Sequence, residues 1–237
     1  RPVRSSPPTA IQRPTWGGTE SKASMSVLLD GANSAQLIEH DFTKHTQLID
    51  EIVSQSALEF EIEPPITVFG KQCRQQRDVQ FRSDVSKGYF YSNQVMQSQP
   101  LTQEMTTLLG IVNDTLGANF NGILINRYVD GTKSVAAHAD SESGLNEIAG
   151  VVAISHGTTR NFRIRDISTK AIIGNYDAKQ YMALQMKGPF QANYTHEIPQ
   201  QKKIKSQRIS LTFREHDPIK ELALFAKVQS RKRALGD

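Results

Sequence analysis

The stretch RISLTFR, residues 208–214, alternates polar and apolar residues over seven positions. Alternate side chains of an extended strand point to the same face, so this pattern predicts a strand with two different faces. The apolar face consists of Ile209, Leu211 and Phe213. The polar face consists of Arg208, Ser210, Thr212 and Arg214. We expect such a strand to place one face on the hydrophobic core and the other in a polar pocket.

Short runs of β-forming residues separated by turn residues continue outward from this stretch. They cover residues 122–128, 134–138, 149–155, 161–165, 180–187 and 206–213. Parallel strands need crossover connections of about a dozen residues, usually helical, and no such helical pattern lies between these runs. The sequence therefore predicts antiparallel sheets arranged as a sandwich or jelly roll.

Two helices are expected before residue 120 because apolar residues recur there at helical spacing. The first stripe, within residues 45–56, consists of Leu48, Ile49, Ile52 and Val53. The second stripe ends at Gly117 and consists of Leu101, Met105, Leu108, Leu109, Val112 and Leu116. Both stripes are typical of helices that pack on a core.

The expected fold class is α+β and mainly β, a double-stranded β-helix (jelly-roll) core with N-terminal packing helices. Residues 1–25 are rich in Pro, Ser, Thr and Gly and are expected to be a flexible lead-in. Residues 26–120 would hold the packing helices, 121–216 the jelly-roll core, and 217–237 a basic C-terminal tail.

Composition narrows the class of protein. The chain has 237 residues with 38% hydrophobic content, enough for a sizeable core in one domain or two small ones. Its longest apolar runs fall far short of the roughly 20 residues of a membrane span. Cys73 is the single cysteine, so no internal disulfide forms, and a reducing intracellular compartment is expected.

The net charge of +4 is unevenly distributed. Residues 28–66 hold eight acidic residues and one lysine, a local charge of −7, so the rest of the chain carries +11. Basic residues cluster at 71–82, 160–170, 202–205 and 227–233. Such clusters suit a polyanion such as nucleic acid, and they are equally compatible with a solvated surface.

Three separated residues are candidates for a metal site. His138 and Asp140 lie two positions apart in an extended segment, so the imidazole and the carboxylate point to the same face. His196 follows 56 residues after Asp140. Two histidines and one carboxylate form the facial triad of non-haem Fe(II) oxygenases, which leaves positions open for a co-substrate and O₂. Taken alone the pattern is weak evidence, because six histidines and many aspartates make chance matches common.

A pocket arginine can hold a carboxylate through two parallel hydrogen bonds. Arg208 and Arg214 lie six residues apart, about 20 Å along a strand, so both reach one small dicarboxylate only by leaning together or by distortion. Arg208 is therefore the preferred carboxylate ligand. For Arg214 the alternative role is to brace the site.

Several motifs in order resemble the AlkB family of Fe(II)- and 2-oxoglutarate-dependent dioxygenases. They are Asn126-Arg127-Tyr128-x-x-Gly131, His138-x-Asp140, His196, and Arg208 with five residues before Arg214. The upstream segments Val68-Phe69-Gly70-Lys71 and Gly88-Tyr89-Phe90-Tyr91-Ser92 extend the resemblance over about residues 64–216. The ten-residue step from Tyr128 to His138 and the VFGK run are similar to the branch that repairs alkylated duplex DNA.

The resemblance implies a role for each residue of the polar pocket. His138, Asp140 and His196 would bind Fe(II), and Arg208 would pair with the distal carboxylate of 2-oxoglutarate. Asn126 and Tyr128 would donate hydrogen bonds to this co-substrate. Arg214 would support its other end or fix Asp140. Ser210 stands where the family often has Asn, so one contact to 2-oxoglutarate would be missing or mediated by water.

The same resemblance implies nucleotide-recognition segments within residues 26–120 and a catalytic core at 121–216. Four residues are matched to substrate contacts. Tyr91 aligns with an aromatic residue that stacks on a flipped base, opposite the ring of His138, and Tyr89 belongs to the same segment. Glu142 matches an acidic position that touches the base edge. Phe69 resembles an apolar finger that fills the gap in the duplex. Phe69 and Tyr91 are equally compatible with ordinary core packing.

Departures from the family pattern bear on substrate choice rather than on the metal triad. Asp140-Ser141-Glu142 replaces the frequent Asp-Asp-Glu, and Gln76-Arg77 replaces the usual Pro-Arg. His156 lies outside the motif and is expected to be a strand-end residue that binds no metal.

The resemblance implies an oxidative demethylase that uses Fe(II), 2-oxoglutarate and O₂ to repair N-alkylated bases in DNA, most simply N1-methyladenine and N3-methylcytosine. The alternatives are an RNA demethylase with the same chemistry, a hydroxylase of a protein or lipid, and a catalytically silent binding module. The expected partner is alkylated DNA or RNA, with no membrane, no obligate protein partner and a monomeric state. The expected location is intracellular, nuclear in a eukaryote and otherwise cytoplasmic.

Overall fold

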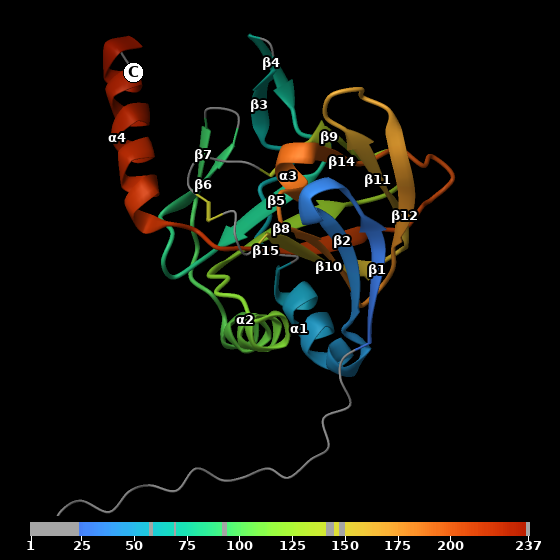
Figure 1. Ribbon diagram of the computed structural model, residues 1–237. Coiled ribbons are helices and arrows are strands. Elements are labelled where there is room, and N and C mark those ends of the chain that lie inside the picture. Colours follow the sequence, from blue (N-terminus) through green and yellow to red (C-terminus); the bar gives the residue numbers. More distant parts are fainter. Residues whose placement is uncertain are drawn as a thin grey trace, which may run out of the picture.

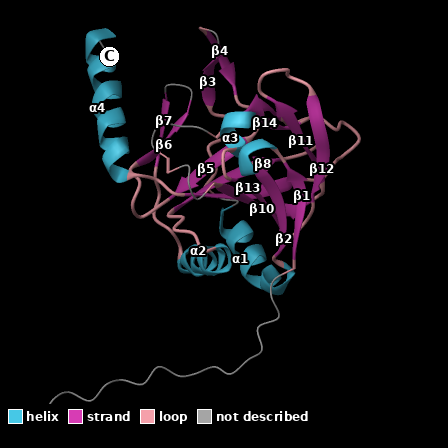
Figure 2. Ribbon diagram, viewed as in Figure 1, coloured by secondary structure: helices cyan, strands magenta, loops and turns pink. Residues whose placement is uncertain are grey.

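The computed structural model describes residues 24–56, 59–68, 70–91, 94–140, 145–146 and 150–235. Two antiparallel sheets form its centre, and two helices lie together at one side of them (Figure 1; Figure 2). The expected fold class, mainly β with a jelly-roll core, is confirmed.

The larger sheet has seven strands in the order β1-β2-β13-β10-β15-β8-β5. Their bounds are β1 Met25–Asp30, β2 Gln36–Asp41, β13 Met182–Lys187, β10 Val151–Gly157, β15 Arg208–Arg214, β8 Gly122–Tyr128 and β5 Asp78–Arg82. The smaller sheet has the order β12-β11-β14-β9, with β12 Ile172–Ala178, β11 Arg160–Asp166, β14 Tyr194–Ile198 and β9 Val135–His138. Two hairpins stand outside these sheets, β3 Pro65–Val68 with β4 Lys71–Arg74, and β6 Gly88–Tyr91 with β7 Gln94–Gln97.

The apolar face of β15 packs under two helices, as its alternation predicts. These helices are α1 Thr46–Ser56 and α2 Gln103–Leu116. Ile209, Leu211 and Phe213 share one buried cluster with α1 and α2 side chains. Thr102 caps α2 by accepting from the Met105 amide, and Gly117 ends it with a left-handed φ of 62°. Elsewhere lie the short helices η1 Ala32–Ser34, η2 Thr43–His45 and α3 Phe190–Asn193, and the longer α4 Pro218–Leu235.

A second buried cluster fills the space between the two sheets. The larger sheet contributes Tyr128, Val151, Leu184 and Met186, and the smaller sheet contributes Phe162, Ile164, Tyr194 and Ile198. Because inward-facing residues of both sheets meet here, the polar residues of β8 and β15 on this side can line a pocket only where the apolar packing stops.

The region before residue 121 contains strands that the periodicity did not predict. β1 and β2 extend the larger sheet beside β13, and β5 completes its other edge beside β8. A boundary at residue 121 therefore cuts through this sheet. On one side β2 pairs with its neighbour β1, and on the other side with β13, which lies more than a hundred residues along the chain, so that this second pairing leaves no local signal in the sequence.

Two strands and one helix after residue 121 also differ from expectation. β12 and β14 were not predicted, because β12 is a largely exposed edge strand and the buried face of β14 includes the polar His196. Residues 217–237, expected as a basic tail, contain α4. Asp217 begins this helix by accepting from the amides of Ile219 and Lys220.

No helix in the described part of the chain is both long and apolar enough to cross a membrane. Cys73 lies exposed in β4 with a free thiol.

Replacing Leu211 with Ala should lower the free energy of unfolding by about 2–5 kcal/mol, because the side chain is fully buried under α1 and α2. Urea unfolding followed by circular dichroism measures this change. Leu222→Ala is the matched control, since Leu222 is 55% exposed, and it should change stability by less than about 0.5 kcal/mol. Equal losses in both variants would contradict the assignment of the β15 face to the core.

Candidate active site

A pocket of about 400 Å³ opens between the two sheets. The larger sheet lines it with the polar face of β15 and with Asn126 and Tyr128 of β8. The smaller sheet contributes His138 from β9 and His196 from β14. Ser210 lies directly opposite Asn126 and Arg208 opposite Tyr128 in the β15–β8 register. Side chains opposite each other share a face, so these four residues form two neighbouring pairs on the pocket wall.

The structure brings His138, Asp140 and His196 together. His138 and His196 lie directly opposite each other on neighbouring strands, and Asp140 follows the end of β9. One donor atom from each of the three lies within 4.8 Å of the other two. Asp140 Oδ1 is 3.6 Å from His138 Nε2, and Asp140 Oδ2 is 3.8 Å from His196 Nε2. The two imidazoles come from a cross-strand pair. The carboxylate of Asp140 points to the same side as His138 because the two residues are two positions apart.

Electrostatics keep these three groups in the forms that bind a metal ion. Burial lowers the pKa of His138 despite the nearby Asp140, and burial together with His138 lowers the pKa of His196 to about 3. Both imidazoles are therefore neutral at neutral pH. Burial alone would raise the pKa of Asp140, but the positive charge of Arg214 outweighs it and holds that pKa below its ordinary value.

Three neighbours hold Asp140 and one imidazole in place. Arg214 Nη2 lies 2.7 Å from Asp140 Oδ1, and both side chains are almost fully buried. Gln191 of α3 accepts a hydrogen bond from the Asp140 amide at 2.9 Å. His138 Nδ1 lies 2.9 Å from the Ala136 carbonyl, and a donated hydrogen there leaves Nε2 as the free donor atom. Two neutral imidazoles and one ionised carboxylate suit Fe(II), so the residues present fit the ion.

The other end of the pocket suits an organic carboxylate. Arg208 is 2% exposed and has no acidic partner in the part of the chain that the structure describes. Its Nη2 donates to Ser155 Oγ at 2.9 Å, while its Nε, like Asn126 Oδ1, is buried without a hydrogen-bond partner among the described residues. Burial lowers the pKa of Arg208 to about 10, so the guanidinium remains charged at neutral pH. A buried charge without a counter-ion is costly, and a bound carboxylate would remove that cost.

Arg160 lies beside Tyr128, outside the pocket lining, and holds the surrounding loops through hydrogen bonds. It is fully buried, and its guanidinium donates to the carbonyls of Asp130, Lys133 and Pro199 and to Gln201 Oε1 at 2.8–3.1 Å. The guanidinium carbons of Arg160 and Arg208 lie 5.7 and 5.6 Å from the Tyr128 ring centroid. Membership in a basic cluster had indicated a surface charge for Arg160, and the structure corrects this.

The residues matched to substrate contacts have different outcomes. Tyr89 is 4% exposed, packs on Phe81, and lines a second pocket of about 390 Å³ that shares Arg77 with the first. Tyr91 ends β6, and its side chain lies outside the described part of the structure. Phe69 and Glu142 lie outside the described residues. The substrate roles of these four residues stay predictions.

Three contributors to the site were not identified from the sequence: Ser155, Gln191 and Arg160. Ser155 lies opposite Ser210 in the β10–β15 register, and alternation along β10 was the only signal for it. Gln191 sits on a helix of four residues, too short for a periodic pattern. His156, outside the motif, lies 3.0 Å from Asp50 near the end of β10 and away from the pocket lining.

Comparisons with known proteins agree with this site. The sequence model described as the 2OG-Fe(II) oxygenase superfamily matches residues 35–214. The human protein named DNA oxidative demethylase ALKBH2 is 27% identical over 156 residues, which cover 63% of this chain and 60% of that protein. The rat protein named alpha-ketoglutarate-dependent dioxygenase alkB homolog 3 is 29% identical over 135 residues, covering 53% and 46%. The chain thus matches less than two thirds of the length of these two relatives.

A solved structure, titled the structure of OsALKBH1, superposes with a TM-score of 0.56 at 16% identity, covering 81% of this chain and all of that one. This likeness concerns the fold. The sequence match from residue 35 to residue 214 contains every residue of the pocket described above. The chain therefore belongs to the 2OG-Fe(II) oxygenase superfamily, and within it the chain is similar to the AlkB proteins ALKBH2 and alkB homolog 3.

Proposed function

We propose that this protein removes alkyl groups from N-alkylated bases in DNA, with N1-methyladenine and N3-methylcytosine as substrates. The observation that carries the proposal is one pocket with two complementary ends. At one end, two neutral imidazoles and a carboxylate place their donor atoms within 4.8 Å of one another. At the other end, the buried Arg208 has no acidic partner among the described residues.

The chain's own residues would bind and orient both cofactors. His138, Asp140 and His196 would hold Fe(II), and Arg208 would hold a carboxylate of 2-oxoglutarate through its planar fork. With these bound, Fe(II), 2-oxoglutarate and O₂ supply the oxidation that hydroxylates the N-alkyl carbon. Asn126 and Tyr128 lie directly opposite Ser210 and Arg208, where they can donate to the co-substrate. The surrounding apolar cluster limits access of water to this space.

Positive charge on the surface supports a polyanionic substrate. This surface charge is smaller than the amino-acid composition suggests. Arg77, Arg82 and Arg160 are buried, so they do not add to the surface charge. Two groups of exposed cations lie on the β3–β4 hairpin and on the loop before β15, namely Lys71, Arg74, Lys202, Lys203 and Lys205, and other exposed lysines are spread over the described surface. Such residues can neutralise phosphates. The human relative's name, DNA oxidative demethylase, favours DNA over RNA.

Incubation with single-stranded DNA, duplex DNA and RNA of one sequence, each carrying one methylated base, tests the proposal. We expect loss of the methyl group in DNA, followed by mass spectrometry, with one succinate formed per base restored. Omission of Fe(II) or 2-oxoglutarate should abolish both products.

Each other outcome points to a different function. Demethylation of RNA alone would mean that RNA, and not DNA, is the substrate. Succinate without base repair would indicate a non-nucleic-acid substrate. Absence of both products would indicate a silent binding module. DNA affinity that does not weaken with salt would also argue against a phosphate-contacting surface. Monomeric state and intracellular location stay predictions.

Replacing His138 with Ala should abolish Fe(II) binding and turnover and leave the fold nearly intact, because the imidazole lies at the end of β9 and is partly exposed. Anaerobic Fe(II) titration with circular dichroism measures both effects. His156→Ala is the matched control, since that imidazole contacts Asp50 outside the pocket, and it should bind iron like the parent protein. Retained iron affinity in His138→Ala would refute the metal assignment.

Replacing Arg208 with Lys should raise the KM for 2-oxoglutarate at least about tenfold, because an ammonium group cannot form the two parallel hydrogen bonds of a guanidinium. Initial rates at varied 2-oxoglutarate measure the change. Arg163→Lys is the control, because Arg163 pairs with Glu197 instead of lining the pocket. An unchanged KM in Arg208→Lys would mean that another cation holds the co-substrate.

A further inference from the structure

The first turn of α4 has an inverted burial pattern. Two apolar residues, Ile219 and Leu222, are 81% and 55% exposed, while Glu221 between them is 3% exposed. Acidic side chains are seldom buried without specific partners, so the burial of Glu221 requires an explanation. The superfamily match ends at Arg214, before this helix begins. Figure 1 shows α4 extending away from the sheets, so its first turn is the place where it joins them.

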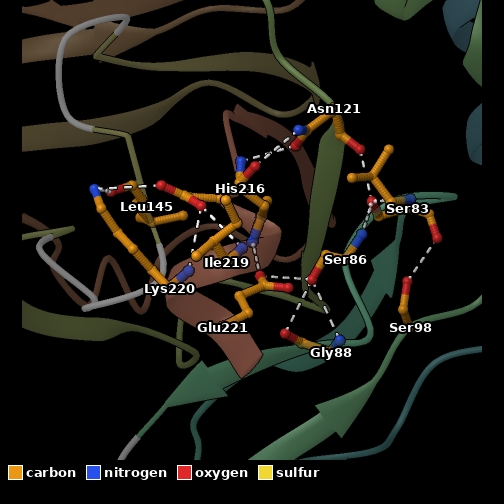
Figure 3. Close-up of polar contacts among 12 residues, drawn as sticks. Ser83, Ser86, Gly88, Ser98, Asn121, Leu145, His216, Ile219, Lys220 and Glu221 are labelled. Atoms are coloured by element: carbon orange, nitrogen blue, oxygen red, sulfur yellow. Dashed lines mark hydrogen bonds and ion pairs between the residues drawn. The ribbon is translucent and has the colours of Figure 1, made fainter. Parts of the chain in front are cut away.

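Glu221 accepts two hydrogen bonds at the root of α4, as Figure 3 shows. Its Oε1 lies 2.8 Å from Ser86 Oγ and 2.8 Å from His216 Nδ1. Beside it, Lys220 Nζ donates to the carbonyl of Leu145 at 3.2 Å. The first turn of α4 therefore contacts three segments: the turn before β6, the segment after β15, and the chain beyond Asp140.

Ser86 links Glu221 to strand β6 through hydrogen bonds. A hydroxyl has one hydrogen, and the charged Glu221 oxygen is its stronger acceptor, so Ser86 Oγ is left to accept from the Gly88 amide at 3.2 Å. Gly88 begins β6 against β7, where a Cβ would lie 2.6 Å from the Met96 carbonyl oxygen. The start of β6 is thus held from both sides, by Ser86 and by β7.

The next residue, Tyr89, connects β6 to the metal site. The Arg214 guanidinium carbon lies 4.9 Å from the Tyr89 ring centroid, and Arg214 contacts Asp140 at 2.7 Å. On its other side Tyr89 packs on Phe81 with ring centroids 5.8 Å apart, and Phe81 packs on His216 at 4.9 Å. A closed ring of contacts therefore runs from Glu221 through Ser86, β6, Tyr89 and Phe81 back to His216.

We propose that Glu221 is a positioning residue for substrate, which through Ser86 and His216 fixes β6 and Tyr89 against Arg214. The second pocket is lined by Tyr89 and Met96 from this hairpin and by Arg77. It adjoins the metal pocket, so its wall would receive the part of the substrate that lies next to the reacting group. This inference rests on the proposed nucleic-acid substrate, and it assigns α4 a role in binding that substrate rather than iron or 2-oxoglutarate.

Kinetics of Glu221→Ala and Ser86→Ala test the proposal. Each variant should raise the KM for a methylated oligonucleotide about fivefold or more while the KM for 2-oxoglutarate changes less than about twofold. The double variant should be little worse than either single one, because both remove the same contact. Glu221→Gln retains a carbonyl acceptor and should recover most of the affinity. Glu51→Ala, an exposed glutamate on α1, is the matched control and should behave like the parent.

Hydrogen exchange gives a readout that needs no substrate. Amides of β6 and β7 should exchange faster in Ser86→Ala and Glu221→Ala, while those of β8 and β15 stay protected. If the parent protein proves inactive on oligonucleotides, the proposed function fails and exchange still decides whether Glu221 holds β6. Unchanged exchange in β6, an unchanged oligonucleotide KM, or equal rises in both KM values would each overturn the proposal.

Discussion

The buried ion pair between Arg214 and Asp140 is the interaction on which the site depends. Arg214 ends β15 of the larger sheet and Asp140 follows β9 of the smaller sheet, so the pair joins the two sheets at the pocket. Both side chains are nearly inaccessible, and loss of one partner from such a pair costs about 3–5 kcal/mol. The same arginine keeps the carboxylate ionised against the effect of burial. This one contact therefore joins the two sheets and keeps the Asp140 carboxylate in the charged form that can bind a metal ion.

The pocket places its charges where cofactors can balance them. Asp140 has Arg214, whereas Arg208 is buried beside neutral partners, Ser155 and the ring of Tyr128. This asymmetry distinguishes two arginines that share one strand face. Arg214 has a carboxylate partner within the chain, whereas Arg208 has none among the described residues and is the arginine proposed to hold an external carboxylate. The guanidinium of Arg160, on the Tyr128 side of the pocket, donates hydrogen bonds to three carbonyl groups and one side-chain amide oxygen. These bonds hold the surrounding loops in place.

The proposed substrate side includes a hairpin that belongs to neither of the two sheets. The β6–β7 hairpin lies outside both sheets, and its position depends on what holds its first residues. Ser86, Phe81 and Arg214 supply this support from three directions, and α4 adds a buried carboxylate to it. A hairpin of two short strands is marginally stable alone, so these external contacts decide its geometry.

The sequence alone determined which residues face the pocket along each strand, because side chains alternate with a period of two wherever a strand forms. For this reason alternation within 208–214 grouped Arg208 with Ser210, Thr212 and Arg214, and a spacing of two grouped His138 with Asp140. The helices α1 and α2 were predicted from their apolar stripes in the same way. The residues that lie opposite each other depend on the fold as a whole: His196 is across from His138, Arg214 contacts Asp140, β2 pairs with β13, and Glu221 contacts Ser86, 135 residues away in the sequence. These contacts depend on sheet register and burial, which join distant segments and leave no periodic signal in the local sequence.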